Sequence, residues 1–339
     1  MPFRGIAGHQ HLLQLIGRAA LRGSLPPSLI FSGPAGVGKR MAAIALAQLV
    51  NCQAPRIDDA EHVDSCGECA PCRRIARGVH ADVLIVKPGD TGTIKVDQVR
   101  DAVERSAYRP FEGRRRVVIF DDADGLMPEA QNALLKTLEE PPAASTFILV
   151  TSRPDTLLPT VRSRCQRLRF GRLSAADVAS VLVRDHEYAD GDAHAAAAMS
   201  DGSVGAALEG GTDDYVEARQ AAATMLQTVA ATDDPRRRLQ GAKALAPGGR
   251  GGRDWSERDE LARRLHALSS MLRDITILLT RADERQLANA DLVPLFRGVM
   301  RSFDGERALR AFSAVDRALV ALDRNASPKI VADWIAFQI

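Results

Sequence analysis

The stretch GPAGVGKR, which begins at Gly33, combines three glycines and a lysine at a spacing that could hold phosphate groups. Gly33, Gly36 and Gly38 let backbone N–H groups approach phosphate oxygens. Lys39 follows them and can reach the outer phosphates of a nucleotide. The next position of such a loop is ordinarily Ser or Thr, whose hydroxyl binds Mg²⁺, but here it is Arg40. We therefore expect a nucleotide-type loop in which one metal ligand is missing.

Two carboxylates follow a run of branched apolar residues in VVIFDDADGL. Asp121 and Asp122 stand where an ATPase would hold Mg²⁺ with one acid and polarise the attacking water with the other. A solvated acidic turn is the alternative, but acids placed directly after a buried strand favour the first interpretation. We therefore count both acids, together with the glycine loop, among the candidate cofactor-binding residues.

Four of the five cysteines lie close together in the sequence, at Cys52, Cys66, Cys69 and Cys72. The two short spacings bring three sulfurs within reach of one tetrahedral ion, and Cys52 would supply the fourth. Such a site has no open position for a substrate, so we expect structural zinc. Four free, reduced cysteines are the alternative. His62 lies between the first two cysteines and is expected to take no part.

The glycine loop and the acids need a scaffold that positions them. The sequence pattern in the first half of the chain predicts alternating strands and helices. The run SLIFSG leads into the glycine loop as a buried strand, and KRMAAIALAQLV continues from it as a helix. Further strands are predicted at 82–86, 115–120 and 146–151, and further helices at 96–105 and 128–138. This alternation favours an α/β layer built on a parallel sheet.

The second half of the chain has no strand pattern after residue 170. Its Ala-rich amphipathic segments predict a small helical unit at 171–210 and a larger helical domain at 211–339. The segment APGGRGGRD at 246–254 is interpreted as a loop between helices, because amphipathic patterns continue on both sides of it. The expected fold class is therefore α/β plus all-α.

Composition makes several function classes unlikely candidates. The 339 residues include 45 Lys and Arg against 43 Asp and Glu, a net charge of +2, so bulk charge does not favour tight independent binding of nucleic acid. Aromatic residues make up only 4%, which argues against a surface that stacks single-stranded bases. No apolar run of about 18 residues exists and MPFRGIAGHQ has no signal-type core, so we expect a cytoplasmic protein without membrane contact.

Three stretches together carry a resemblance to a known family: FSGPAGVGK, CGECAPC and VVIFDDADGLMPEAQNALLKTLEEPPAASTFILVTSRPDTLLPTVRSRCQRLRF. In order and spacing they resemble the AAA+ clamp-loader subunits of bacterial DNA polymerase III, over about half of the chain. The resemblance implies an AAA+ P-loop domain at 1–170 with a zinc module at 52–72. It further implies a helical lid at 171–210 and a helical collar, which joins subunits, at 211–339.

The tripeptide Ser163-Arg164-Cys165 matches a family motif. In the clamp loaders that the chain resembles, the arginine of this motif is an arginine finger that enters the ATP site of a neighbouring subunit. The resemblance therefore implies a catalytic role in trans for Arg164. An ordinary surface arginine in a basic stretch is the alternative. Cys165 is expected to be a small packing residue.

Three departures from the family pattern favour a delta-prime-like subunit over an ATP-hydrolysing gamma/tau-like one. Arg40 replaces a metal ligand, and Asp122 stands where the family has a catalytic Glu. Gly205 stands where gamma/tau carries a sensor arginine. We therefore expect a stator subunit in which ATP and Mg²⁺ can bind but ATP is not hydrolysed.

The resemblance also implies a hetero-oligomer with gamma/tau and delta subunits, which brings the chain to the sliding clamp and primed DNA. An active gamma/tau-like ATPase is the first alternative, although tau-type chains usually continue in a long polar tail and this sequence ends at Ile339. A second alternative is an AAA+ motor acting on DNA junctions, against which the cysteine module and the LLKTLEEPP and SRC motifs argue.

Overall fold

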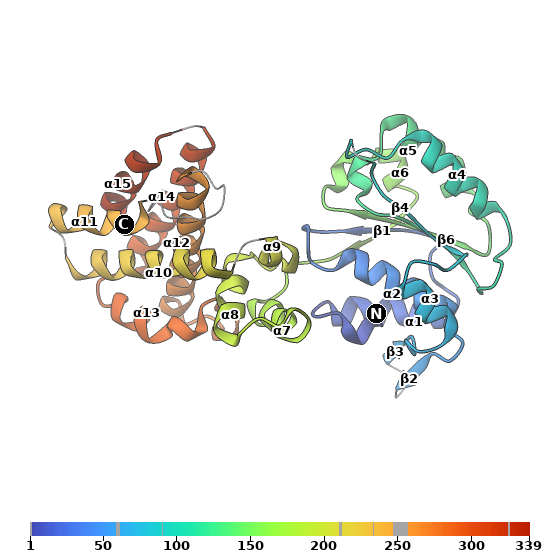
Figure 1. The fold of residues 1–339 in the computed structure, drawn as a ribbon, viewed down its shortest axis with the longest axis horizontal. Helices are drawn as coiled ribbons and strands as arrows, with labels where there is room; N and C mark the ends of the chain where they lie inside the picture. The colour runs from blue at the N-terminus through green and yellow to red at the C-terminus, as the bar shows by residue number, and fades with distance from the viewer. Residues whose placement is uncertain are drawn as a thin grey trace. The chain divides into compact units, whose positions relative to one another are not determined.

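A computed structural model describes residues 2–58, 62–89, 91–209, 212–232, 234–246, 257–324 and 326–339. The chain divides into two compact units, Met1–Leu173 and Ser174–Ile339. In the described residues the first unit holds every assigned strand, and every element assigned in the second unit is helical (Figure 1). The expected change from an α/β layer to helices after residue 170 is confirmed.

The first unit is built on a five-stranded parallel sheet with the order β4-β5-β6-β1-β7. Its strands are β1 (Ser28–Ser32), β4 (Val83–Val86), β5 (Arg116–Phe120), β6 (Ser145–Thr151) and β7 (Gln166–Arg169). The three central strands, β1, β5 and β6, are buried along their whole length, as expected for parallel strands covered on both faces. Because all five strands point the same way, the loops after β1, β5 and β6 share the carboxyl edge of the sheet.

Helices cover both faces of the sheet. The first face carries α1 (Gln10–Leu21), α2 (Lys39–Asn51) and α3 (Ala70–Ala76), and the second carries α4 (Val96–Ala107), α5 (Pro128–Glu139) and α6 (Pro159–Arg162). Alternate residues of β5 divide between the two cores: Val117 and Ile119 pack with the first set, Val118 and Phe120 with the second. Short 3-10 turns lie at Phe3–Gly5, Ala123–Gly125 and Pro154–Thr156. The expected α/β layer built on a parallel sheet is confirmed.

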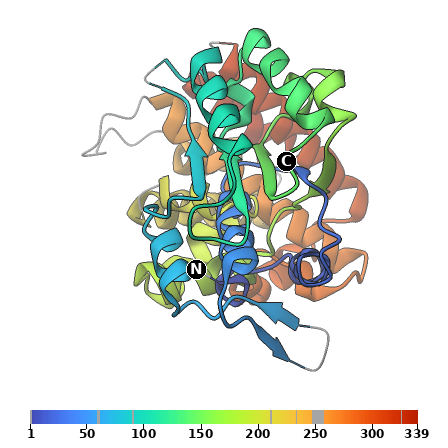
Figure 2. The same cartoon turned by 90° about the vertical axis from the view of Figure 1, so that its right-hand side faces the viewer.

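A small antiparallel hairpin lies in the segment that the sequence analysis left without secondary structure. Its strands are β2 (Arg56–Asp58) and β3 (His62–Asp64), drawn as two blue arrows near the bottom of Figure 2. Val63 is buried against helix α1, where a side-chain carbon added to Gly17 would lie 2.9 Å from the Val63 carbonyl oxygen. Close packing of β3 on α1 therefore attaches the hairpin to the α/β unit.

The second unit contains nine helices among its described residues. They are α7 (Ala175–His186), α8 (Asp190–Met199), α9 (Val204–Glu209), α10 (Thr212–Ala231), α11 (Pro235–Leu245), α12 (Glu257–Leu279), α13 (Val293–Val299), α14 (Gly305–Asp323) and α15 (Pro328–Gln338). Two 3-10 turns lie at Glu284–Gln286 and Ala290–Leu292.

The core of this second unit is formed mainly by helices α10, α12, α14 and α15. Helix α8 joins it through a hydrogen bond that Ser270 Oγ of α12 donates to the Ala198 carbonyl, 3.2 Å away. The proposed division into a lid and a collar at residue 210 therefore falls inside one compact unit and stays a prediction. The predicted loop at 246–254 lies, except for Ala246, outside the described residues. No helix in the described ranges is both long and apolar enough to cross a bilayer.

Candidate functional site

The glycine loop lies between β1 and α2 and has a backbone that glycine alone adopts readily. Gly36 has φ 70° and Gly38 has φ 95°, both in the left-handed region that favours glycine. At Gly33 a side-chain carbon would lie 2.0 Å from the carbonyl oxygen of Phe170, so no larger residue fits without moving the end of β7. Helix α2 begins at Lys39, directly after the loop, and its first N–H groups have no acceptor within the helix. The loop therefore has the backbone for which its glycines are needed, and phosphate binding by it stays a prediction.

Lys39 is folded back onto its own loop. Its Nζ donates to the carbonyl oxygens of Gly33 at 2.7 Å and Pro34 at 2.5 Å, and the residue is only 7% exposed. Burial lowers the pKa of Lys39, while the carboxylates of Asp124 and Asp122 act in the opposite direction. The ammonium group thus lies inside the loop, where it would meet a phosphate chain.

Arg40 pairs with the first acid after β5. Its Nε lies 3.2 Å from Oδ2 of Asp121, which has only 8% of its side chain exposed, against 47% for Arg40. Burial raises the pKa of Asp121, and the neighbouring guanidinium opposes that rise by favouring the carboxylate. The residue that replaces the metal ligand therefore contacts the acid that was expected to hold the metal.

The second predicted acid lies in a different environment. Asp122 is exposed and has φ 52°, a left-handed conformation unusual for a residue other than glycine. A third acid, Asp124, was missed by the sequence analysis, since only the DD pair matches the ATPase pattern. Asp124 accepts hydrogen bonds from the Thr151 hydroxyl and, at 3.0 Å each, from the N–H groups of Ser152 and Arg153.

These contacts determine the ionisation of Asp124. Burial alone would raise its pKa, but the hydrogen bonds from Ser152 and Thr151 hold the pKa below its ordinary value. A carboxylate at this position joins the segment after β5 to the end of β6. It therefore fixes the position of the acidic turn beside the glycine loop.

The four clustered cysteines come together as the sequence predicts. Their sulfurs all lie within 4.8 Å of one another, with 4.0 Å between Cys52 and Cys69 and 4.0 Å between Cys66 and Cys72. Four sulfurs at 2.3 Å from one tetrahedral zinc ion would be about 3.8 Å apart. The cluster therefore fits such an ion after small movements.

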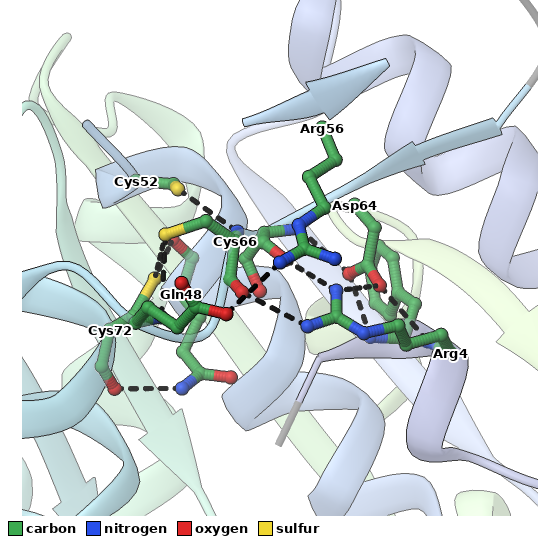
Figure 3. A network of polar contacts seen from close by, with 10 residues as sticks. Arg4, Gln48, Cys52, Arg56, Asp64, Cys66 and Cys72 are labelled. Atoms are coloured by element: carbon green, nitrogen blue, oxygen red, sulfur yellow. Dashed lines mark hydrogen bonds and ion pairs between the residues drawn. The ribbon is translucent and has the colours of Figure 1, made fainter. Parts of the chain in front are cut away.

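Backbone donors and neighbouring side chains support this cluster (Figure 3). The N–H of Cys66 donates to Cys52 Sγ at 3.3 Å, and the N–H of Cys69 donates to Cys66 Sγ at 3.3 Å. Although burial raises the pKa of the Cys66 thiol, backbone donors outweigh it and lower that pKa to about 6. Gln48 Nε2 donates to the Cys72 carbonyl at 2.8 Å, which joins α2 to α3.

The N-terminal segment contacts both the cysteine cluster and the glycine loop. The Arg4 guanidinium donates to the carbonyl of Ser65 at 2.9 Å and to that of Cys66 at 3.0 Å. Five residues later, His9 Nε2 lies 3.2 Å from the Val37 carbonyl. Sequence analysis singled out neither residue, because such contacts to backbone groups leave no motif. His62 belongs to β3 and is not part of the four-sulfur group.

Arg164 follows the short helix α6 and is held by helix α5. Its Nε lies 2.8 Å from Oε1 of Glu139, and its Nη1 donates to the Thr160 carbonyl at 2.8 Å. The Arg164 side chain is 33% exposed. The next residue, Cys165, is buried, and burial raises the pKa of its thiol to about 12, as suits a packing residue.

Sheet topology separates Arg164 from the glycine loop of its own chain. Strand β7 runs parallel to β1, with Gln166 beside Leu29 and Arg169 beside Ser32. The glycine loop follows the carboxyl end of β1, whereas Arg164 precedes the amino end of β7, so the two lie at opposite edges of the sheet. The four residues of β7 span about 13 Å. The structure thus brings together the loop, Lys39, Arg40 and Asp121, but not Arg164.

Comparisons with known families and relatives find similarity over the α/β unit. A family model described as "DNA polymerase III, delta subunit" matches residues 8–174. The tau subunit of Bacillus subtilis DNA polymerase III is 36% identical over 173 residues, which cover 51% of this chain and 30% of that protein. The delta' subunit of Pseudomonas aeruginosa is 41% identical over 134 residues, 39% of each chain.

The chain thus spans well under half the length of these two relatives. Among solved structures, a gamma subunit-related protein of DNA polymerase III from Thermotoga maritima aligns over 96% of this chain and 97% of its own. Its sequence identity is 17% and the TM-score is 0.38.

Proposed function

We propose that this chain is a delta-prime-like stator subunit of a clamp loader, because residues 8–174 match a model of DNA polymerase III subunits and are similar to tau, gamma and delta' subunits. In this role it joins gamma/tau and delta subunits in a hetero-oligomer in the cytoplasm. The assembly loads the sliding clamp onto primed DNA at the expense of ATP. This chain contributes structure and one catalytic group, and does not hydrolyse ATP itself.

The observation that carries the proposal is the ion pair between Arg40 and Asp121. ATP hydrolysis by a P-loop protein needs Mg²⁺ between the loop hydroxyl, the acid after the strand and the phosphates. Here the hydroxyl is absent and the acid is occupied by a guanidinium. Asp122 and Gly205 replace two further groups that the family's ATPases use, so loss of hydrolysis is the simplest account of all three changes.

The position of Arg164 supports a finger that acts in trans. The residue lies at the amino edge of the sheet, whereas the glycine loop of the same chain lies at the carboxyl edge. An arginine placed so can serve a phosphate chain only in a neighbouring subunit. We assign this role to Arg164, and Glu139 is the residue that orients it before assembly.

We also assign a structural zinc ion to Cys52, Cys66, Cys69 and Cys72. When bound, the ion supplies a cross-link and no open coordination position for chemistry. The cysteines join the end of α2, the loop after the hairpin and the start of α3. Their role is therefore to fix the module at 52–72 on the α/β unit.

ATP turnover by the purified chain tests the stator assignment. We expect negligible turnover by the chain alone, and assembly with gamma/tau and delta into a complex that separates from the free subunits by gel filtration. Turnover by the isolated chain at the rate of a clamp-loader ATPase would instead support the gamma/tau-like alternative. That alternative has one observation in its favour, because the match to a tau subunit covers more of this chain than the match to a delta' subunit.

A motor acting on DNA junctions, the second alternative, receives less support. The family match and the relatives with subunit names all point to DNA polymerase III. Mixing the chain with gamma/tau and delta separates the two possibilities, because a junction motor would form no complex with them.

A further inference from the structure

The site at the glycine loop contains a cation of its own where related loops use a metal ion. Arg40 occupies the position of the metal-binding hydroxyl, and its Nε lies 3.2 Å from Asp121 Oδ2. A guanidinium offers only donors and carries a permanent positive charge, so it cannot bind Mg²⁺ and repels it. Asp121 is nearly buried, so its negative charge is balanced mainly by Arg40. A metal ion in this loop would contact the hydroxyl at position 40 and the carboxylate of Asp121. Arg40 replaces the first of these groups and pairs with the second.

The parts of the loop that bind phosphate without a metal are intact. Gly36 and Gly38 have the left-handed backbone that turns N–H groups toward a phosphate. Helix α2, which is 13 residues long, begins directly after them, so that its N-terminus faces the loop. Lys39 is already inside the loop, where it donates to two neutral carbonyl oxygens. A charged phosphate oxygen is a stronger hydrogen-bond acceptor than a carbonyl oxygen. The ammonium group can therefore give up a carbonyl and donate to a phosphate.

Arg40 can contact a phosphate chain while it keeps its ion pair. The guanidinium has five N–H donors, and the ion pair places Nε 3.2 Å from Asp121 Oδ2. Its side chain is 47% exposed, so a ligand in the loop can approach the guanidinium. The planar pair of donors suits phosphate oxygens.

From this arrangement we infer that the loop binds the free, metal-less form of a nucleoside triphosphate or diphosphate, with Arg40 in the place of Mg²⁺. The nucleotide is held and not hydrolysed, because no metal and no activated water accompany it. This inference rests on the proposed function at the same loop, since it names the ligand of a site that we assign as non-hydrolytic.

Equilibrium dialysis of the full chain against ATP, with excess EDTA or with excess Mg²⁺, tests the inference. We expect binding in EDTA to be tighter than in Mg²⁺ by about tenfold or more, because Arg40 repels the metal that accompanies MgATP. ADP should likewise bind more tightly in EDTA than in Mg²⁺.

Variants identify the groups responsible. Arg40→Ser restores a hydroxyl and should reverse the preference, so that ATP binds better with Mg²⁺ than with EDTA. Lys39→Ala should weaken binding in both conditions. Arg22→Ser, at the exposed end of α1, is the matched control and should behave as the unchanged chain. Circular dichroism of each variant verifies that it is folded.

Two results would overturn the inference: an unchanged chain that binds ATP only with Mg²⁺, or a folded chain that binds ATP in neither condition. Neither result bears on Arg164 or on assembly with gamma/tau and delta. The stator proposal therefore stands or falls on separate measurements.

Discussion

Two arginines, each paired with a carboxylate of the same chain, carry most of the functional argument at the scale of single residues. Arg40 pairs with Asp121 inside the glycine loop region, and Arg164 pairs with Glu139 at the other edge of the sheet. The first pair occupies a site where catalysis would need a metal. The second presents a cation where a neighbouring subunit could use it. In the proposed function, the first pair prevents ATP hydrolysis by this chain and the second orients Arg164 for a neighbouring subunit.

Glu139 is expected to act as a positioning residue for Arg164. The pair is partly exposed, so Glu139→Ala should change the free energy of unfolding by no more than about 1 kcal/mol. In a reconstituted clamp loader, ATP turnover stimulated by DNA should fall, but less than with Arg164→Ala. This follows because the finger remains while its orientation is lost.

The neighbouring exposed acid, Glu140, provides the control. Glu140→Ala should leave turnover at the level of the unchanged complex. Equal turnover in the Glu139 and Glu140 variants would show that the ion pair to Arg164 has no part in the neighbour's chemistry.

At the scale of elements, short segments attach functional parts to a buried sheet. The segment that starts with Phe3–Gly5 reaches both the cysteine cluster, through Arg4, and the glycine loop, through His9. The cysteines in turn join α2 to α3, and α2 begins at the loop. Loss of the module at 52–72 would therefore remove support from one side of the loop.

Removal of one cysteine tests the zinc assignment. We expect about one zinc per chain after purification without added metal, and much less in Cys52→Ser, because three thiolates leave the tetrahedral site incomplete. The melting temperature should fall in the variant and after treatment with a strong chelator. Cys165→Ala, which changes a cysteine outside the cluster, should keep its zinc. A folded, unchanged chain without zinc by elemental analysis would contradict the assignment.

A buried carboxylate fixes the turn between α4 and β5. Asp82 accepts from the N–H groups of Phe111, Glu112 and Gly113 at 2.7 to 2.9 Å, and from Arg116 Nη2 at 2.8 Å. Burial would raise its pKa, but these donors outweigh it and lower the pKa from 3.8 to about 2. The ionised form is thus favoured in the folded chain.

The stabilisation from Asp82 should consequently depend on pH. It is fully present above pH 3.8 and is lost as the pH falls toward about 2, where the folded chain also takes up the proton. At neutral pH, Asp82→Asn should lower the free energy of unfolding by about 2 kcal/mol, as measured by urea titration. Asp97→Asn, at an exposed acid of α4, should have little effect. An equal loss at neutral pH and below pH 2 would exclude ionisation as the cause.

The sequence predicted the central sheet well, because β1, β5 and β6 are short runs rich in branched apolar residues, which is typical of buried parallel strands. It did not predict the hairpin, whose strands have three residues each and are mostly exposed. The cysteine cluster followed from spacing alone. The pairing of Arg40 with Asp121 did not, because the two residues are far apart in sequence and meet only through the order of the strands.

At the scale of the whole molecule, the proposed function places the chain in an assembly. The chain has a glycine loop in which Arg40 pairs with Asp121 and, at the opposite edge of the same sheet, Arg164, to which we assign the finger role. A helical unit follows at Ser174–Ile339, for which we propose the lid and collar functions of the family. In the assembly that we propose, this subunit adds a catalytic group to its neighbour and hydrolyses no ATP.

The most direct test compares Arg164→Ala with Lys39→Ala in a clamp loader reconstituted with gamma/tau and delta, by measuring ATP turnover stimulated by DNA. Both variants should fold and assemble. Arg164→Ala should lower ATP turnover and clamp loading. The total rate should fall by less than the rate at the one ATP site that Arg164 serves, because the other sites keep their own arginine fingers. Lys39→Ala should leave both activities nearly unchanged. Loss of activity with Lys39→Ala and none with Arg164→Ala would contradict the account, because the chain would then be a motor that hydrolyses its own ATP.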